Sequence, residues 1–281
     1  MSIHSIDDLK KFHNHAKHFF EAELGLLHEV LPKIIDERLG KCSVLLSSSL
    51  QTGAALLQLA DKINHFNSES IMLGRAFIEK TANFCYASIC DEKEYRAFIL
   101  HPIYKNYHNS IITTREDNLD DIVKIRAERK EKQEKLKQYD IVKEALEIFS
   151  EKNPNLNWTK KTLNQRIDVI REKGKILDVF FSISKFQYYS DASEILHGSL
   201  YGCTHNFGIF DPDFDIDKID ELETRLYKDS TCMLIDLGML IHESLTLISY
   251  SSKIDEIWEP SYHNRGKALN LKLHVLGRNI K

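Results

Sequence analysis

Apolar side chains recur every three to four residues along most of this chain, in long stretches that few helix-breaking residues interrupt. The 281 residues include only five prolines and eleven glycines. Apolar positions at this spacing form one face of an amphipathic helix. The pattern therefore predicts an all-α protein, a multi-helix bundle that forms a single domain over residues 1–281.

Two stretches are apolar nearly all round, Ile71–Cys90 and Ile176–Tyr201. A helix without a polar face is typically buried. We therefore expect both helices in the interior of the bundle, packed against each other.

Start and stop signals delimit the other helices. Ser5 is a good N-cap for the first helix, which Pro32 should divide. Gly40 should close a short helix, and the polar cluster Asn67–Ser70 should cap the helix over 71–90. Further helices are predicted over residues 42–65, after the N-cap Asp91, and over Lys218 to about Tyr250.

Residues 118–173 have a different character. The stretch Arg126–Lys135 contains one apolar residue, and a helix that is polar all round cannot lie on a core. We expect a protruding charged helical hairpin made of Asn118–Glu151 and Thr159–Lys173, either solvated or contacting a partner or RNA. Beyond Ser251 the sequence predicts a short irregular tail, in which 271–275 alternates like a strand.

The charge balance changes the list of candidate functions. A net charge of −4 argues against a general basic coat for nucleic acid, although a local basic patch remains compatible with it. The five cysteines lack metal-binding spacing and lie mostly in apolar runs, as reduced thiols do. The N-terminus does not read as a signal peptide, and no segment approaches about 20 apolar residues. We therefore expect a cytoplasmic protein without a membrane segment.

Charged residues in the apolar segments are the candidate site. Arg75 and Glu79 stand four residues apart on one helix and can pair, which a buried charge requires. In the other segment His197 follows Ser193 and Glu194, which could fix its tautomer, and precedes Gly198, which would admit a ligand or a backbone. Either the residues form a structural network, or they form a reactive site.

No cofactor and no metal is expected. His13, His15 and His18 lack the i, i+4 spacing of two ligands on one helical face, and no phosphate-binding glycine loop occurs. The alternating aspartates of 211–217 depart from the calcium-loop pattern at its glycine and at its final glutamate.

The order of these residues resembles a known pattern. Arg75 with Glu79, followed about a hundred residues later by Tyr189, Ser193 and His197-Gly198-Ser199, is similar to a bacterial family of helical domains of unknown function. That family is similar in outline to the HEPN proteins, helical bundles that include metal-independent ribonucleases of toxin and anti-phage systems. The resemblance covers about residues 40–250. The usual HEPN arginine lies four to six residues before the histidine, whereas here Arg75 would supply the charge from another helix.

The resemblance implies a metal-independent ribonuclease-like effector with RNA as a candidate partner. His197 would transfer protons, Arg75 would stabilise charge on the phosphate, and Glu79 and Glu194 would orient them. Tyr189, Ser193, Gly198 and Ser199 would support the site. A homodimer or a hetero-complex is expected. The alternative is a non-catalytic interaction or sensing module whose Arg–Glu–His network is structural.

Overall fold

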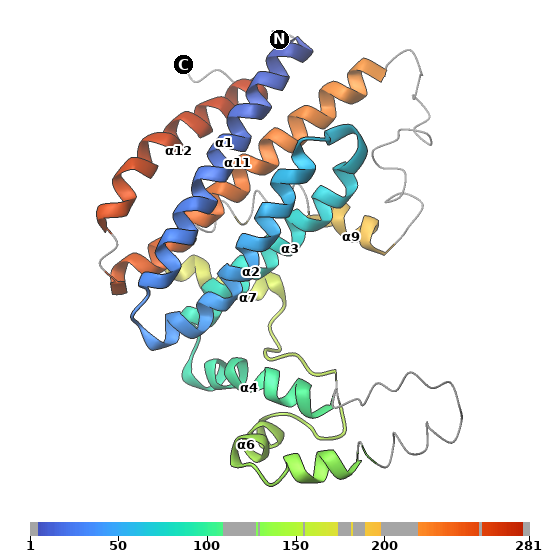
Figure 1. Ribbon diagram of the computed structural model, residues 1–281, viewed down its shortest axis with the longest axis vertical. Helices are drawn as coiled ribbons and strands as arrows, with labels where there is room; N and C mark the ends of the chain where they lie inside the picture. The colour runs from blue at the N-terminus through green and yellow to red at the C-terminus, as the bar shows by residue number, and fades with distance from the viewer. Residues whose placement is uncertain are drawn as a thin grey trace. The chain divides into compact units, whose positions relative to one another are not determined.

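A computed structural model describes residues 5–108, 128, 130–153, 155–173, 181, 189–197, 219–252 and 255–277 (Figure 1). The described residues form helices and turns without a strand, which confirms the all-α multi-helix architecture. They group into two compact units, residues 1–88 with 163–281 and residues 89–162.

The first unit begins with a capped helix, α1 (Ile6–Val30). The Ser5 hydroxyl accepts a hydrogen bond from the Asp8 amide at 3.2 Å, as an N-cap does. Pro32 lies in the short 3-10 turn that ends this helix, as predicted. The unit continues with α2 (Glu37–Ala60) and α3 (Ile63–Ile89), and later contains α7 (Leu163–Lys173), α9 (Ser190–Leu196), α11 (Ile219–Ser252) and α12 (Asp255–Val275).

The sequence misplaced two helix starts. We expected a break at Gly40, but α2 begins at Glu37, capped by the Asp36 carboxylate, and runs through Gly40. We also expected Asn67–Ser70 to cap the next helix, but α3 begins at Ile63 and includes that cluster. Both errors have one cause: helix packing overrides the low intrinsic propensity of glycine, serine and asparagine.

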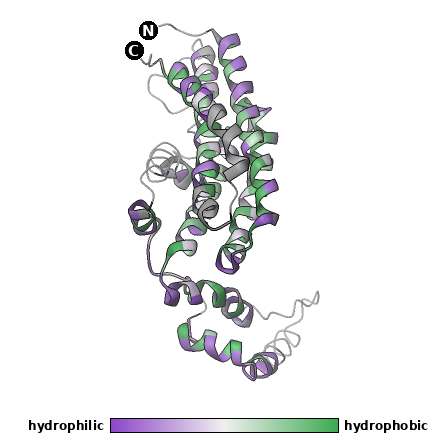
Figure 2. Cartoon of the chain, turned by 90° about the vertical axis from the view of Figure 1, so that its left-hand side faces the viewer, coloured by the Kyte–Doolittle hydropathy of each residue, from purple (hydrophilic) through white to green (hydrophobic). Residues whose placement is uncertain are grey.

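The centre of this unit is α11. Every residue from 230 to 245 is buried. This helix runs beside α1 and α12, and hydrophobic and hydrophilic residues alternate around the helices of the unit (Figures 1 and 2). At Gly74, α3 approaches α11 so closely that an added Cβ would lie 2.9 Å from the Met233 sulfur. Residues 71–89 of α3 are all buried or half-buried, which confirms the predicted interior helix.

The predicted irregular tail is wrong, because residues 255–275 form α12. The buried face of its described part contains Ala268, Lys272 and Val275, which recur with helical spacing. Lys272 is the reason for the error: a cation occupies a core position there. Its ammonium lies 2.5 Å from the Asp236 carboxylate of α11.

A second ion pair joins the same two helices. Arg265, half-buried on α12, donates to the buried Glu243 of α11. The two acids, Asp236 and Glu243, stand seven residues apart on α11, and the two bases stand seven residues apart on α12. Both pairs fit one antiparallel register, since residues seven apart lie on the same helical face.

The second unit contains α4 (Glu92–His108), a helix over 130–136 and α6 (Asp140–Ile148). Its core stacks Tyr104 on Phe149, with ring centroids 4.6 Å apart. The remaining core residues are Ala97, Leu100 and Ala145. As predicted, Asp91 caps α4 through the Glu94 amide.

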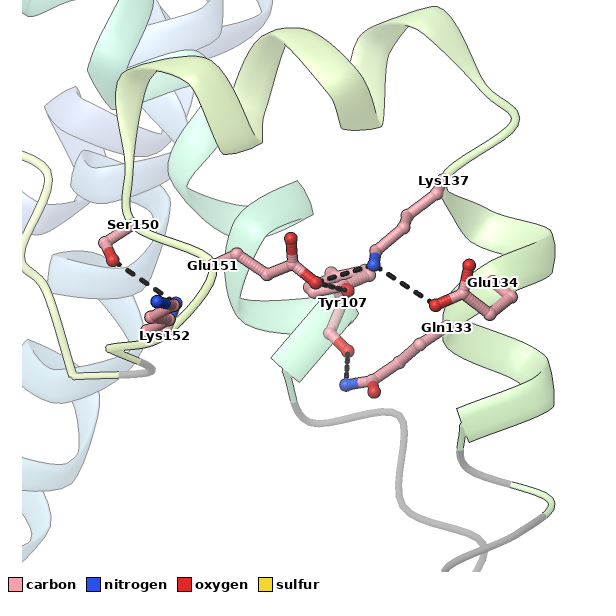
Figure 3. A network of polar contacts seen from close by, with 7 residues as sticks. All are labelled: Tyr107, Gln133, Glu134, Lys137, Ser150, Glu151 and Lys152. Carbon is pink, nitrogen blue, oxygen red and sulfur yellow. Dashed lines mark hydrogen bonds and ion pairs between the residues drawn. The ribbon is translucent and has the colours of Figure 1, made fainter.

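A polar network holds the same unit together outside its core (Figure 3). The Lys137 ammonium lies 2.6 Å from Glu151 and 3.2 Å from Glu134. The Tyr107 hydroxyl donates to Glu151 at 3.1 Å. This network ties the turn after the 130–136 helix to both α4 and the segment that follows α6.

The predicted hairpin differs in its elements. A single helix was expected over 118–151, but its described part is divided by a turn at residues 137–139. The second predicted arm, Thr159–Lys173, contributes α7, and that helix belongs to the first unit. The chain returns to the first unit at Leu163, so the charged segment forms part of the compact unit over 89–162.

One helix in the described part of the chain, α2, is long and apolar enough to cross a membrane by length and composition. The core helix of a soluble protein passes the same test, so this is weak evidence for a membrane segment. The α2 helix packs against α1 in this structure.

A buried histidine joins three helices of the first unit and gives it a pH dependence. The His13 ring of α1 donates through Nε2 to the Ala60 carbonyl at 2.9 Å and lies 3.4 Å from the Thr231 hydroxyl. Burial lowers the pKa of His13 below its usual 6.5, and the nearby Lys17 acts in the same direction. The unfolded chain therefore binds a proton at a higher pH than the folded chain does.

We expect stability to be full above pH 6.5 and to fall as the pH drops toward the folded-state pKa of His13. One unmatched proton corresponds to at most about 1.4 kcal/mol for each pH unit. Urea unfolding of His13→Gln, which keeps a donor for Ala60 but does not titrate, should show a flatter profile. An unchanged slope in this variant would assign the acid sensitivity to other groups.

Candidate functional site

The centre of the candidate site is the Arg75–Glu79 pair of α3. The Arg75 Nε donates to the Glu79 carboxylate at 3.0 Å, and the two side chains are 18% and 38% exposed. Residues four apart on a helix face the same way, so α3 by itself positions both groups. The pair predicted from the sequence is therefore formed, in a half-buried setting.

Tyr189, just before α9, completes a closed triangle with this pair. The Arg75 Nη2 lies 3.3 Å from the Tyr189 hydroxyl, which donates to Glu79 at 2.8 Å. The Arg75 guanidinium also lies over the Tyr189 ring, 4.3 Å from its centroid, in a cation–π contact. One guanidinium nitrogen, Nη1, is buried and makes no hydrogen bond in the described part of the chain.

Sequence reasoning missed a second arginine at this site. Arg166 of α7 donates to the Asn83 carboxamide oxygen. Asn83 follows Glu79 by four residues, so the two share one face of α3. The four-residue spacing of Arg75, Glu79 and Asn83 could have indicated from the sequence that Asn83 shares their face of α3. Only the packing of α7 on this face brings Arg166 to it.

The electrostatics of this cluster set the protonation of its members. Burial raises the pKa of Tyr189, and the hydrogen bond to Glu79 raises it further, so the phenol is neutral at pH 7 and available as a donor. Burial lowers the pKa of Arg166, while the negative charge of Glu79 opposes that shift. Glu79 therefore interacts with both arginines.

The predicted histidine lies outside this triangle. His197 is exposed at the end of α9, where its amide bonds to the Ser193 carbonyl at 3.0 Å. In the described part of the chain, no hydrogen bond or ion pair joins it to Arg75, Glu79 or Tyr189. Gly198 and Ser199 lie outside the described residues.

The end of α9 does not lie in the interior, contrary to our expectation. Ala192 is buried, but Glu194 is exposed and Leu196 is 58% exposed. The apolar count of this segment predicted full burial, whereas α9 is a seven-residue helix in which Ala192 is the buried residue among the side chains that are described. Exposure leaves His197 open to solvent and to ligands.

A different histidine lies at the centre of the bundle. His242 of α11 is fully buried, with Nδ1 3.6 Å from Glu23 of α1 and Nε2 bonded to Arg265 of α12. Because the arginine N–H must donate, Nε2 accepts and the ring is neutral with its proton on Nδ1. Burial lowers the pKa of His242, which agrees with this state. The lone pair of the His242 Nε2 is thus occupied by the Arg265 donor, so we assign His242, Glu23 and Arg265 a structural role.

Metal-binding clusters and reactive thiols are two further kinds of candidate chemistry. No group of three or more histidine, cysteine, aspartate or glutamate side chains there could hold a metal ion. Burial raises the pKa of both Cys85 and Cys232 to about 12, so neither thiol is a thiolate at neutral pH. A cavity of about 450 Å³ lies between α1 and α12, away from the predicted site residues.

Comparison with known proteins identifies a family. The model of a family described as "Family of unknown function (DUF5677)" matches residues 42–215, more than half of the chain. No curated protein and no solved structure is significantly similar to this chain. The matched range includes the Arg75–Glu79–Tyr189 triangle, Arg166 and His197. The chain therefore belongs to this family of unknown function.

Proposed function

We propose that this protein is a metal-independent, ribonuclease-like effector of a bacterial toxin or anti-phage system, which binds an RNA phosphate at the Arg75–Glu79–Tyr189 triangle. One observation carries the proposal. Glu79 and Tyr189 orient the Arg75 guanidinium in a half-buried setting, and its Nη1 makes no hydrogen bond in the described part of the chain. An oriented guanidinium matches phosphate oxygens in charge and geometry.

The proposed chemistry is transesterification. The His197 imidazole removes the proton of a ribose 2′-hydroxyl, and the 2′-oxygen attacks the adjacent phosphorus. The bond to the 5′-oxygen breaks, that oxygen takes up a proton from solvent water, and a 2′,3′-cyclic phosphate is left. Arg75 stabilises the charge that develops on the phosphate. The exposure of His197 supports this role, because the base must reach a bound strand.

A second candidate, a non-catalytic interaction or sensing module, is favoured by a different observation. Arg75, Glu79 and Tyr189 bond to one another, and in the described part of the chain no hydrogen bond or ion pair joins them to His197. In this alternative the triangle fixes α9 on α3 and has no reactive role. Partner binding that is unchanged by His197→Ala and by Arg75→Lys would favour the module.

RNA integrity after induced expression tests the effector function. We expect RNA fragments with wild type and a loss of about 10²–10⁴-fold in cleavage rate with His197→Ala, the range for a general acid–base group. His15→Ala removes another exposed histidine and should cleave like wild type. Circular dichroism melts establish that each variant is folded. Intact RNA with wild type and both variants, or equal cleavage by all three proteins, would refute the proposed ribonuclease function.

The proposed effector works in the cytoplasm as a homodimer or in a hetero-complex with other subunits. Light scattering across a dilution series tests the homodimer. If the protein is a monomer at every concentration, the homodimer is refuted and the hetero-complex remains the proposal.

A further inference from the structure

The cavity between α1 and α12 is a candidate ligand site that the proposed function does not use. Its volume of about 450 Å³ falls within the range of small-molecule pockets, about 300–1,000 Å³. The two helices run side by side (Figure 1). All described residues that line the cavity belong to α1 and α12, so the site lies within the first unit.

The inner part of the cavity is apolar. Phe19 and Ala268 are buried there, and Leu271 is half-buried. These side chains offer no hydrogen-bond donor or acceptor, so a sugar or a nucleobase would lose hydrogen bonds to water without replacement. An alkyl group makes no such bonds and gains free energy when it leaves water. The cavity therefore fits the apolar body of a ligand.

The rim of the cavity is basic. His18 and Lys267 line it with exposed side chains. His18 has an acidic neighbour, since its Nδ1 lies 3.6 Å from the Glu21 carboxylate. No ion pair in the described part of the chain includes Lys267, whereas its neighbours on α12 pair with acids of α11. The Lys267 ammonium is thus the cation that a ligand can use.

The sequence keeps acidic side chains away from this rim on both helices. Residues 9–20 and residues 260–281 contain no aspartate and no glutamate. The described parts of these stretches lie along each other, because Leu9 packs with Val275 and the Phe12 ring lies 5.3 Å from the His274 ring. A negative charge beside Lys267 therefore meets no acid from the surrounding residues of α12.

From this arrangement we propose that the cavity binds a medium-chain alkyl carboxylate. The alkyl chain packs against Phe19, Ala268 and Leu271, and the carboxylate accepts hydrogen bonds from the Lys267 ammonium. Charge complementarity favours the anion over a neutral apolar molecule, because a hydrogen bond between charged groups is stronger than one between neutral groups. The site uses none of the residues of the Arg75–Glu79–Tyr189 triangle, so the inference is independent of the proposed function.

Titration calorimetry of the full chain with three ligands tests the proposal. Octanoate has two more CH₂ groups than hexanoate, and each buried CH₂ should tighten binding about fourfold, the factor that corresponds to about 0.8 kcal/mol. Octanoate should therefore bind about fifteenfold more tightly than hexanoate. The neutral 1-octanol should bind about fivefold more weakly than octanoate, the factor for the roughly 1 kcal/mol of an exposed ion pair.

Two variants separate the charge from the cavity. Lys267→Gln should weaken octanoate binding about fivefold and leave 1-octanol binding unchanged, because only the carboxylate needs the ammonium. Ala22 is an exposed residue of the cavity wall, so Ala22→Leu fills the cavity and should weaken both ligands about fivefold or more. Lys33→Gln removes an exposed lysine that does not line the cavity and is the matched control. Circular dichroism melts establish that each variant is folded.

Several results would overturn the proposal. Equal affinities for hexanoate and octanoate, or no saturable binding, would mean that no alkyl chain is buried. Equal affinities for octanoate and 1-octanol, or equal losses in Lys267→Gln and Lys33→Gln, would refute the carboxylate contact. Unchanged binding by a folded Ala22→Leu variant would place the ligand outside this cavity.

Discussion

Replacing Arg265 by alanine is expected to lower the free energy of unfolding by about 3–5 kcal/mol, the range for breaking a buried ion pair on one side. Arg265 is 13% exposed and donates to Glu243, whose side chain is 5% exposed, and to the fully buried His242. Burial already raises the pKa of the Glu243 carboxyl. Removing the guanidinium takes away the charge that neutralises this carboxylate. Urea unfolding measures the loss.

Arg171→Ala is the matched control. Arg171 also has an acidic neighbour, Asp168 at 3.7 Å, but both side chains are more than half exposed. We expect this variant to lose less than about 1 kcal/mol. Adding Glu243→Gln to Arg265→Ala should recover part of the loss, because a neutral amide is less costly to bury. Equal losses in Arg265→Ala and in the control would refute the buried pair.

Replacing Lys272 by aspartate is expected to destabilise the first unit even more than Arg265→Ala does. The Lys272 side chain is 9% exposed and the Asp236 side chain is 1% exposed. The variant removes the cation and puts a second carboxylate beside Asp236 in a low-dielectric environment. We expect a loss of more than about 3–5 kcal/mol, or failure to fold.

The reversed pair is the control for this variant. Asp236→Lys combined with Lys272→Asp restores opposite charges at the same two positions, so most of the lost stability should return. Recovery would mean that the charges themselves hold α12 in register on α11. A reversed pair no more stable than Lys272→Asp alone would assign the effect to packing.

Local signals in the sequence were sufficient for several elements. The Ser5 cap and Pro32 set the ends of α1, because capping and the missing proline amide act over a few residues. The even apolar content of α3 predicted its burial, and the four-residue spacing predicted the Arg75–Glu79 pair. Tyr189 was also expected near this pair, through the family resemblance.

Polar residues at core positions caused the main error in the fold. Lys272 broke the apolar pattern of the C-terminal segment, so a helix was read as an irregular tail. Asp236 and Glu243 likewise concealed that α11 is the central helix. A charge can occupy a core position when its partner is present, and that partner lies on a helix about 20–40 residues away in the sequence.

The sequence by itself determined the all-α class, the buried character of α3 and the Arg75–Glu79 pair, because helical periodicity and i, i+4 contacts are local. Only the tertiary structure decided that Arg166 and Asn83 join this pair, that His197 is exposed, and that α11 forms the centre. These features depend on which helix faces pack together. The Arg166–Asn83 contact spans 83 residues of sequence, a separation at which no local spacing rule applies.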